Sequence, residues 1–396
     1  MQNTKSASSL RRTLATTCLL IVMTGAWADS PVQPRNVTFE GELEVPALPD
    51  DVDTDNAQQS GDPEARGREF VIVPIPSRTP LLGWTLQLPA MYFYKPAAQS
   101  DKDPAWITGA MALYTEDGGW GAGLFQRMNL AEDRWRLMGA AAYADLEYDF
   151  YGIGGDPDTS IPLNQTIGLV TIQALRRVSE QVYVGLRIVT SQSEISLDIN
   201  DDLLPPGIDL PEIGTDINLT SLAPRVRYDS RNNEFSPSAG MYAEASVTLG
   251  RSWLGSDSDY EKWKADFNHY RAVSGAGVLA TRVAMQYLGG EAPFFVYPAF
   301  GSGADLRGYE TGAYRDRFLF AAQTEYRHRL RKRLGVVAFG GVGTIAPEFA
   351  NWEDSLWSVG AGIRWVVAPE NDFSLRIDIA RGRTGTQFYV GLGEAF

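Results

Sequence analysis

The sequence predicts an all-β protein, a transmembrane antiparallel β-barrel of about sixteen strands with one extracellular loop inserted into it. Apolar and polar residues alternate in short segments from about residue 68 to residue 396, which is typical of strands with one apolar and one polar face. No stretch after residue 28 approaches the roughly 18 consecutive apolar residues of a spanning helix. The chain is rich in aromatic residues and glycine, with 17 Tyr, 10 Trp, 17 Phe and 39 Gly. Two classes remain, a soluble all-β protein and a membrane β-barrel.

The first 28 residues have the features of a secretory signal peptide. Lys5, Arg11 and Arg12 form a basic start, and residues 14–25 are apolar or small. The small-x-small triplet at 26–28 then matches the pattern that signal peptidase cleaves. We therefore expect residues 1–28 to be removed.

Cysteine content and charge exclude several classes of function. The only cysteine, Cys18, lies in the expected signal peptide, so the mature chain has no disulfide and no thiolate chemistry. The net charge of −14 becomes −17 after cleavage, because the three lost charges are all positive. A chain this acidic lacks the basic face that nucleic acid requires, so we expect no nucleic-acid partner.

Residues 29–67 form a segment rich in acidic residues and proline, with little apolar periodicity. Such composition cannot bury enough apolar surface to fold alone. We interpret it as an acidic, flexible periplasmic segment that serves as a solvated linker, with binding of a partner as the alternative. The barrel is then expected to occupy residues 68–396.

The sense of the alternation favours a membrane barrel. In residues 357–365 one face carries Trp, Val, Ala, Ile and Trp, and the other carries Ser, Gly, Gly and Arg. A transmembrane barrel turns the apolar face to lipid and the polar, glycine-rich face to the lumen. Trp357 and Trp365 stand at the ends of this segment, where membrane interfaces attract aromatic rings. Tight turns such as 274–277 also contrast with long connections such as 191–219.

The last segment, 387–396, is expected to be a strand that ends in an aromatic residue. The pattern places four apolar residues on one face: Phe388, Val390, Leu392 and Phe396. This segment resembles the terminal insertion signal of bacterial outer-membrane barrels. The resemblance implies the outer membrane of a Gram-negative bacterium, contact with its lipids and lipopolysaccharide, and the barrel assembly machinery as a partner for the chain's own insertion.

Counting alternating segments gives sixteen expected strands. They lie near 68–76, 82–94, 105–115, 119–128, 135–150, 164–178, 181–190, 219–229, 241–251, 261–273, 277–287, 318–330, 334–344, 356–366, 373–381 and 386–396. An even count puts both ends of the barrel on the periplasmic side, so connections after odd strands are extracellular. The longest connections satisfy this rule, and they lie at 151–163, 191–218, 252–260, 288–317 and 345–355.

One extracellular connection contains a glycine-rich run, residues 301–317, with the sequence GSGADLRGYETGAYRDR. The motif Leu306-Arg307-Gly308-Tyr309 in its centre looks like the Val-Arg-Gly-Phe/Tyr motif on the sixth extracellular loop of the BamA/TamA family, the bacterial surface-antigen barrels. Glu325 matches an acidic position of that family on strand twelve. The resemblance implies that the loop folds back into the lumen.

Two further motifs resemble the same family. Asp229 and Arg231, followed by Pro237 and Gly240, are similar to its aspartate-x-arginine hairpin and Pro-x-x-Gly turn. Residues 360–378 are similar to its next-to-last hairpin. The four motifs occur in the family's order, and the resemblance covers roughly residues 68–396.

The chain departs from the family pattern in two places. Gly341 stands where the family has an acid on strand thirteen, so one of the two acids expected to hold the loop arginine is missing. The forty or so residues before the barrel are too few and too irregular for a POTRA domain, so a barrel-only member is expected.

A guanidinium in a lumen needs carboxylate partners, because an unpaired buried charge is costly. We expect Arg307 to pair with Glu325, with Asp378 as a further lumenal partner. Because Gly341 lacks the family acid, fewer charges should hold the loop than in the family. The alternative is a loop arginine free in solvent.

Other candidate sites have simpler interpretations. Asp229 and Arg231 should close a periplasmic turn by hydrogen bonding, with client binding as the alternative. The acidic run 198–216 could bind divalent cations that link it to lipopolysaccharide, but its spacing matches no known calcium loop, so we expect ordinary acidic surface and no metal.

Enzyme motifs are absent from the sequence. The two histidines, His269 and His328, have no evident nucleophile beside them, and the hydrolase, zinc-protease and phosphate-loop motifs do not occur. We expect no enzymatic activity and no cofactor, with a catalytic triad assembled across strands as the alternative.

The resemblance implies that the chain helps to insert or translocate proteins or lipids at the outer membrane. Its client would contact the seam between the first and last strands, or the occluded lumen. The alternative is a passive pore or a structural outer-membrane protein. Association of two copies through the lipid-facing wall is left open.

Overall fold

The computed structural model describes residues 68–79, 82–96, 99, 104–150, 161–196, 216–301, 305–349 and 355–396. The expected signal peptide and the acidic segment 29–67 lie outside these residues, as does all of the acidic run 198–216 except its last residue. The expectations for those segments therefore stay predictions.

The described residues form a single antiparallel sheet with short 3-10 turns. The strands are β1 (Glu69–Ile72), β2 (Ile75–Thr79), β3 (Gly83–Tyr94), β4 (Trp106–Thr115), β5 (Trp120–Leu130), β6 (Trp135–Phe150), β7 (Ile161–Arg177), β8 (Val182–Ser196), β9 (Asp216–Asp229), β10 (Gly240–Gly250), β11 (Tyr260–Ala272), β12 (Gly277–Gly290), β13 (Phe318–Arg329), β14 (Leu334–Ala346), β15 (Ser355–Ala368), β16 (Phe373–Gly382) and β17 (Thr386–Leu392). The 3-10 turns are η4 (Ser252–Leu254), η5 (Phe294–Val296) and η6 (Pro369–Asn371). Within the described ranges, no helix is long and apolar enough to cross a bilayer.

The seventeen strands occupy sixteen positions in the sheet. Both β1 and β2 pair with β3 in one continuous register, which aligns Ile72 with Ala90 and Ile75 with Gln87. Pro74 separates them, because it has no N–H to donate to the ladder. From β2 to β17 each strand pairs with the next. The predicted count of sixteen is confirmed.

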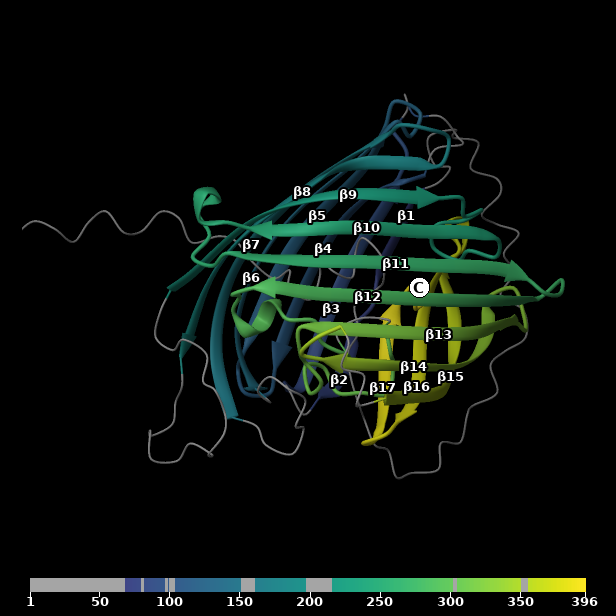
Figure 1. Cartoon of the computed structure of the whole chain (residues 1–396). Coiled ribbons are helices and arrows are strands. Elements are labelled where there is room, and N and C mark those ends of the chain that lie inside the picture. Colours follow the sequence, from purple (N-terminus) through teal and green to yellow (C-terminus); the bar gives the residue numbers. More distant parts are fainter. Residues whose placement is uncertain are drawn as a thin grey trace, which may run out of the picture.

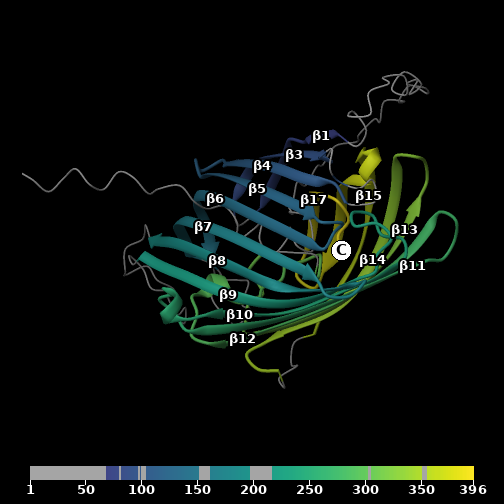
Figure 2. The same cartoon turned by 90° about the horizontal axis from the view of Figure 1, so that it is seen from above.

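The ladder is interrupted at one place, the seam between the first and last strands. Figures 1 and 2 show the sheet curving round, so that yellow β15–β17 come to lie near purple β1–β3. β17 approaches β2 there, but no ladder joins them among the described residues. The η6 turn closes this gap at one end, since the backbone N–H of Glu370 donates to Glu69 Oε1 at 3.0 Å. The fold is a barrel with a seam that the backbone holds weakly.

The barrel is apolar outside and polar inside. On β15 the outward side chains of Trp357 and Ile363 are 44% and 48% exposed, whereas the inward side chains of Ser358 and Arg364 are 1% and 4% exposed. A soluble sheet would bury the apolar residues, so this inversion identifies the outer face as a lipid-facing one. The prediction that the apolar face points outward and the polar face points to the lumen is confirmed.

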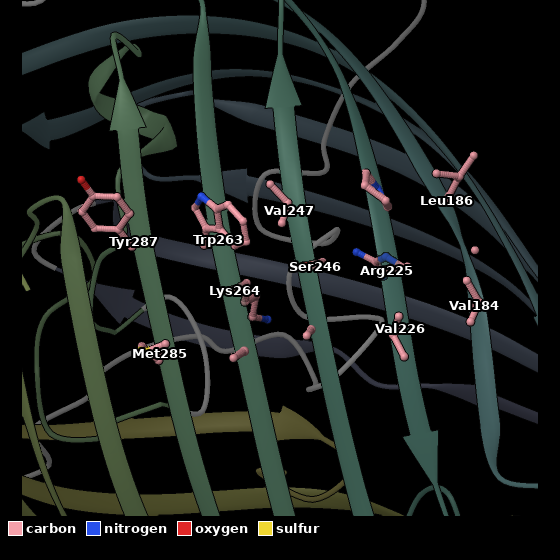
Figure 3. Close-up of a pocket in the computed structure, with 14 residues that line it drawn as sticks. Val184, Leu186, Arg225, Val226, Ser246, Val247, Trp263, Lys264, Met285 and Tyr287 are labelled. Carbon is pink, nitrogen blue, oxygen red and sulfur yellow. The ribbon is translucent and has the colours of Figure 1, made fainter.

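Figure 3 shows this outer face across β8 to β12, opposite the seam. Exposed Leu186, Trp263 and Met285 border a shallow apolar groove of about 490 Å³, whose lining includes the small residues Ala245 and Ala265. The groove lies in the wall that faces lipid.

The connections differ between the two ends of the barrel. Long ones follow β6, β8, β10, β12 and β14, which all finish at one end, here called the loop end. The opposite end, here called the turn end, has four-residue turns after β5, β7, β11, β13 and β15. The connection from β12 to β13 does not stay at the loop end, because Phe300, Leu306 and Tyr309 in it are fully buried. The prediction of an inserted loop is confirmed.

The last segment of the chain corrects the prediction. β17 ends at Leu392, and Gly393 turns the chain inward with φ +79, a conformation that favours glycine. Phe396 then packs inside the barrel against Tyr242 and Tyr270, instead of sharing an outer face with the strand.

Leu392 also turns inward, with 5% exposure, in a cluster that includes Phe373. Phe388 and Val390 are the two residues of the expected apolar face that stay half-buried on β17. The strand ends at Leu392, and Glu394 interrupts the apolar face that the sequence was expected to continue to Phe396.

Candidate functional site

The motif Leu306-Arg307-Gly308-Tyr309 lies inside the barrel, on the inner faces of β13 to β17. Leu306, Arg307 and Tyr309 each have 0% exposure. Gly308 has φ +107, and a Cβ at this position would lie 3.0 Å from the backbone nitrogen of Gly382. Only glycine permits this left-handed backbone so close to β16.

The Arg307 guanidinium binds two carboxylates from different strands. Nη2 lies 2.6 Å from Glu325 Oε2 on β13, and Nη1 lies 2.6 Å from Asp378 Oδ2 on β16. Its Cζ is also 3.4 Å from the ring centroid of Phe339, so the guanidinium stacks on an aromatic face. Hydrogen-bonded carboxylates and a ring are what a buried guanidinium requires. The structure thus brings together all three charges that the sequence singled out.

Two tyrosines hold the backbone of the motif. The hydroxyl of Tyr309 donates to the carbonyl oxygen of Trp357 at 2.6 Å and accepts from the N–H of the same residue at 2.9 Å. The N–H of Gly308 donates to the hydroxyl of Tyr389 at 2.6 Å, and that hydroxyl donates to the carbonyl of Tyr309 at 3.2 Å. The loop is therefore fastened to β15 and β17, next to the seam.

Gly341 carries no acid, but two carboxylates hold Arg307, and the expectation of fewer charges than in the family stays a prediction. Gly341 faces the site from β14, but a Cβ there would lie 2.4 Å from Gln323 Cγ and 3.0 Å from Leu306 Cδ1. Leu306 and Gln323 fill the space that an acidic side chain would need. Asp378 supplies the second carboxylate from β16, so the pair of acids is kept and one of them comes from another strand.

Four more charged residues surround Arg307, and sequence reasoning did not single them out. They are Arg327, Arg364, Arg376 and Glu394. The three arginines lie at alternate positions of the predicted strands that face the lumen, and this position was the signal in the sequence that could have identified them. Glu394 gave no such signal, because it reaches the lumen through the inward turn after β17.

These residues extend the ion pairs into a network. Arg327 Nε lies 2.7 Å from Glu325 Oε1. Arg364 Nη1 lies 2.5 Å from Asp378 Oδ1, and its Nε lies 2.7 Å from Glu394 Oε2. Each carboxylate that holds the loop is thus also held by an arginine from the barrel strands.

A second ion pair fixes the start of the described loop segment. Arg282 on β12 donates to Asp305 Oδ1 from Nε at 3.0 Å and from Nη2 at 2.7 Å, and it also binds Asp266 on β11 at 2.6 Å. Sequence reasoning missed this anchor, because Asp305 and Arg282 belong to no motif that was recognised.

The connection from β9 to β10, residues 230–239, blocks the other end of the lumen. Asp229 Oδ1 and Oδ2 accept from Arg231 Nε and Nη2 at 2.9 and 3.0 Å, so the turn is closed as the sequence predicts. Asp229 also pairs with Arg136 of β6 at 3.0 Å, which carries the turn across the interior. Pro237 is buried, and Gly240 has φ +102 against the Ser230 carbonyl, where a Cβ would lie at 2.2 Å.

The tip of this turn contacts both sides of the seam. Phe235 packs edge-on against Phe93 of β3 at 5.7 Å and against Phe373 of β16 at 5.4 Å between ring centroids. Glu234 forms an ion pair with Arg127 of β5. Burial alone would raise the pKa of Glu234, but the adjacent Arg127 and other arginines outweigh it and hold the pKa below its usual value.

The two histidines do not converge on this site. His269 and His328 lie on the outward face of β11 and β13, where His328 stacks with Tyr326 at 6.1 Å. Within the described ranges, no group of three potential metal-ligating side chains occurs. Among the described residues, the arrangement in the lumen holds the loop through ion pairs between Arg307 and the carboxylates of β13 and β16.

Comparisons with solved structures find the same fold at low sequence identity. BamA from Haemophilus ducreyi lacking POTRA domains 1–3 matches with a TM-score of 0.54 and 15% identity, over 83% of this chain and 70% of that chain. CdiB from Acinetobacter baumannii matches with a TM-score of 0.50 and 12% identity, over 83% and 66%. CdiB from Escherichia coli matches with a TM-score of 0.55 and 11% identity, over 82% and 62%. The chain thus spans less than two thirds of either CdiB chain.

A comparison with curated protein sequences found no match. The Omp85 superfamily domain, in contrast, matches residues 128–396, which contain both the lumenal loop and the turn that blocks the opposite end. Since that match covers more than half of the sequence, the chain belongs to the Omp85 superfamily.

Proposed function

We propose that this barrel assists the insertion or translocation of proteins or lipids at the outer membrane of a Gram-negative bacterium. The client contacts the seam between β2 and β17. The loop end is extracellular in this proposal and the turn end is periplasmic. The wall of the barrel contacts outer-membrane lipids and lipopolysaccharide, and the barrel assembly machinery inserts the chain itself.

The observation that supports this function most is the weak seam. Consecutive strands elsewhere share ladders of 5 to 16 residue pairs, but among the described residues no ladder joins β17 to β2. Unpaired strand edges offer backbone N–H and C=O groups to another strand. A seam that faces lipid can therefore pair with a client without breaking a ladder of its own.

A passive open pore is supported less well. The described loop residues 305–317 lie in the lumen at one end, with Arg307 fully buried, and Phe235 lies at the other end against Phe373. Two obstructions of independent origin are an unusual feature for a channel that conducts steadily. We also propose that the lumen has no catalytic role, because the carboxylates of Glu325 and Asp378 are both bound by arginines.

Photocrosslinking in cells tests this proposal. A photoreactive residue replaces Val390, half-buried on β17 beside the seam, and a matched control replaces Val226, 48% exposed on β9 on the opposite wall. The proposal expects a protein or lipid adduct at position 390 that does not form at 226. The same adducts at both positions, or none at 390, would remove the support for a client at the seam.

A further inference from the structure

The charges around the loop arginine balance when that arginine is left out. The strands and the inward-turned end of the chain contribute six charged side chains around Arg307, here called the wall set: Arg327, Arg364, Arg376, Glu325, Asp378 and Glu394. This set has three cations and three anions, so it is neutral by itself. With Arg307 inserted, four guanidinium groups share three carboxylates.

The surplus cation is found at Arg376. Its side chain has 0% exposure, and none of its three guanidinium nitrogens has a hydrogen-bond partner within the described part of the chain. The carboxylate nearest to it is Asp378, with Nε 3.8 Å from Oδ2. That same oxygen is bound by Arg307 at 2.6 Å. Arg376 is thus adjacent to a carboxylate that the loop arginine occupies.

The register of the sheet adds to the cost of this position. Arg376 is directly opposite Arg364 in the pairing of β15 with β16, and like charges directly opposite each other are destabilising. Arg364 itself is satisfied by Asp378 and Glu394. A buried guanidinium without a hydrogen bond costs free energy that pairing would recover.

We propose that Arg376 replaces Arg307 at Asp378 when the loop leaves the lumen. The loop-in state then contains a wall arginine without a hydrogen bond, whereas the loop-out state leaves Asp378 with Arg364 and Arg376, and Glu325 with Arg327. Release of the loop therefore breaks two ion pairs but leaves no wall carboxylate without a partner. The inserted loop is then a reversible plug, and Arg376 sets the equilibrium between its loop-in and loop-out states.

This inference deepens the proposed function, because an assembly barrel benefits from a plug that can leave, but its test requires no client. The test uses the full chain with Cys18→Ser, which removes the single native cysteine. Ala313→Cys, at a loop position with 3% exposure, then reports release through its rate of labelling by a membrane-impermeant maleimide. Circular dichroism checks that each variant keeps its sheet.

Arg376→Met should slow labelling by about tenfold or more, because the loop-in state loses a buried cation that has no hydrogen bond and the loop-out state loses the substitute at Asp378. Arg376→Lys keeps the charge and should label close to the parent rate. Arg381→Met, on the exposed outer face of the same strand, is the matched control and should label like the parent.

Two outcomes would overturn the proposal: unchanged or faster labelling of Arg376→Met, and equal slowing by Arg376→Lys. If Arg376→Met does not fold, Arg376→Gln replaces it with the same expectation. In an Asp378→Asn background Arg376→Met should slow labelling much less, because the carboxylate that Arg376 would take is gone and only the removal of a buried cation remains. An effect of the same size in that background would assign Arg376 a structural role only.

Discussion

Arg307 Nη1 lies 2.6 Å from Asp378 Oδ2, although the two residues are 71 positions apart in the chain. The first belongs to a connection at the loop end of the barrel, and the second belongs to β16, next to the last strand. Their contact means that the loop crosses the lumen and is fastened beside the seam. A change in the loop can therefore act directly on the strands that a client would meet.

Reversing the charge of the loop arginine should release the loop. Arg307→Glu places a third carboxylate between Glu325 and Asp378, and breaking a buried ion pair in this way costs about 3–5 kcal/mol. We expect rapid labelling of Ala313→Cys in this variant, with the sheet intact by circular dichroism. Arg307→Lys should label at an intermediate rate, because a lysine keeps the charge but loses the two-pronged geometry.

The charge swap Arg307→Glu with Glu325→Arg should restore only part of the protection. The new pair satisfies one contact, but Asp378 then faces a glutamate at position 307, and Arg327 faces an arginine at position 325. Labelling of the single and double variants at the same rate would show that Glu325 does not contribute to holding the loop.

An acid at the family position should weaken this protein. Gly341→Asp would push its Cβ against Gln323 Cγ and the Ala322 carbonyl oxygen, at 2.4 and 2.7 Å before any shift. We expect the thermal midpoint to fall and the loop to label faster, because strain of this kind typically costs about 1–3 kcal/mol. Gly275→Asp, in the turn after β11 where a Cβ meets nothing within 4 Å, is a glycine control outside the lipid-facing wall. A tighter loop in Gly341→Asp would contradict the packing seen at Leu306.

Acid should loosen the turn that blocks the other end of the lumen. The pKa of Glu234 is held below its ordinary value of 4.5 in the folded protein. A depressed pKa contributes stability that is fully present above the unfolded value and is lost as the pH falls through the folded value. The thermal midpoint should therefore fall below about pH 4.5, and it should fall less steeply in Glu234→Gln. Parallel curves for the two proteins would exclude this contribution.

Removing the ring at the tip of the same turn should loosen the seam. Phe235→Ala deletes the ring that contacts Phe93 on one side of the seam and Phe373 on the other, at a cost of about 2 kcal/mol for a partly buried ring. We expect faster amide hydrogen exchange in β1, β2, β16 and β17 than in β9. Phe267→Ala, on the outer wall of β11, serves as the control. An equal increase of amide exchange in all strands would argue against a local role of Phe235 in holding the seam.

The strands could be predicted from the sequence, because a lipid-facing sheet requires apolar and polar residues to alternate, with the apolar residues on the outer face. The bounds of β13 to β16 differ from expectation by only a few residues at each end. The pairing of Arg307 with Glu325 and Asp378 also followed from parity on those strands. The alternation of period two predicts which side chains face the lumen, but it does not predict which side chains they contact.

The partners depend on the shear and diameter of the barrel, which no local pattern encodes. The sequence therefore did not predict that the ion-pair network includes Arg364, Arg376 and Glu394. The end of β17 was missed for a different reason. Phe396 shares the parity of Phe388 although Glu394 interrupts the apolar face, and Gly393 takes a left-handed turn so that Arg364 binds Glu394 inside the barrel.

The central claim is that the inserted loop plugs the lumen, and conductance in planar bilayers tests it most directly. Deletion of residues 305–314 removes Arg307 and the packed tyrosines while leaving β12 and β13 complete. We predict that the full protein is nearly closed and that the deletion raises its conductance, with the turn 230–239 at the turn end as the remaining obstruction. Steady conductance by the full protein, or no change on deletion, would contradict the account.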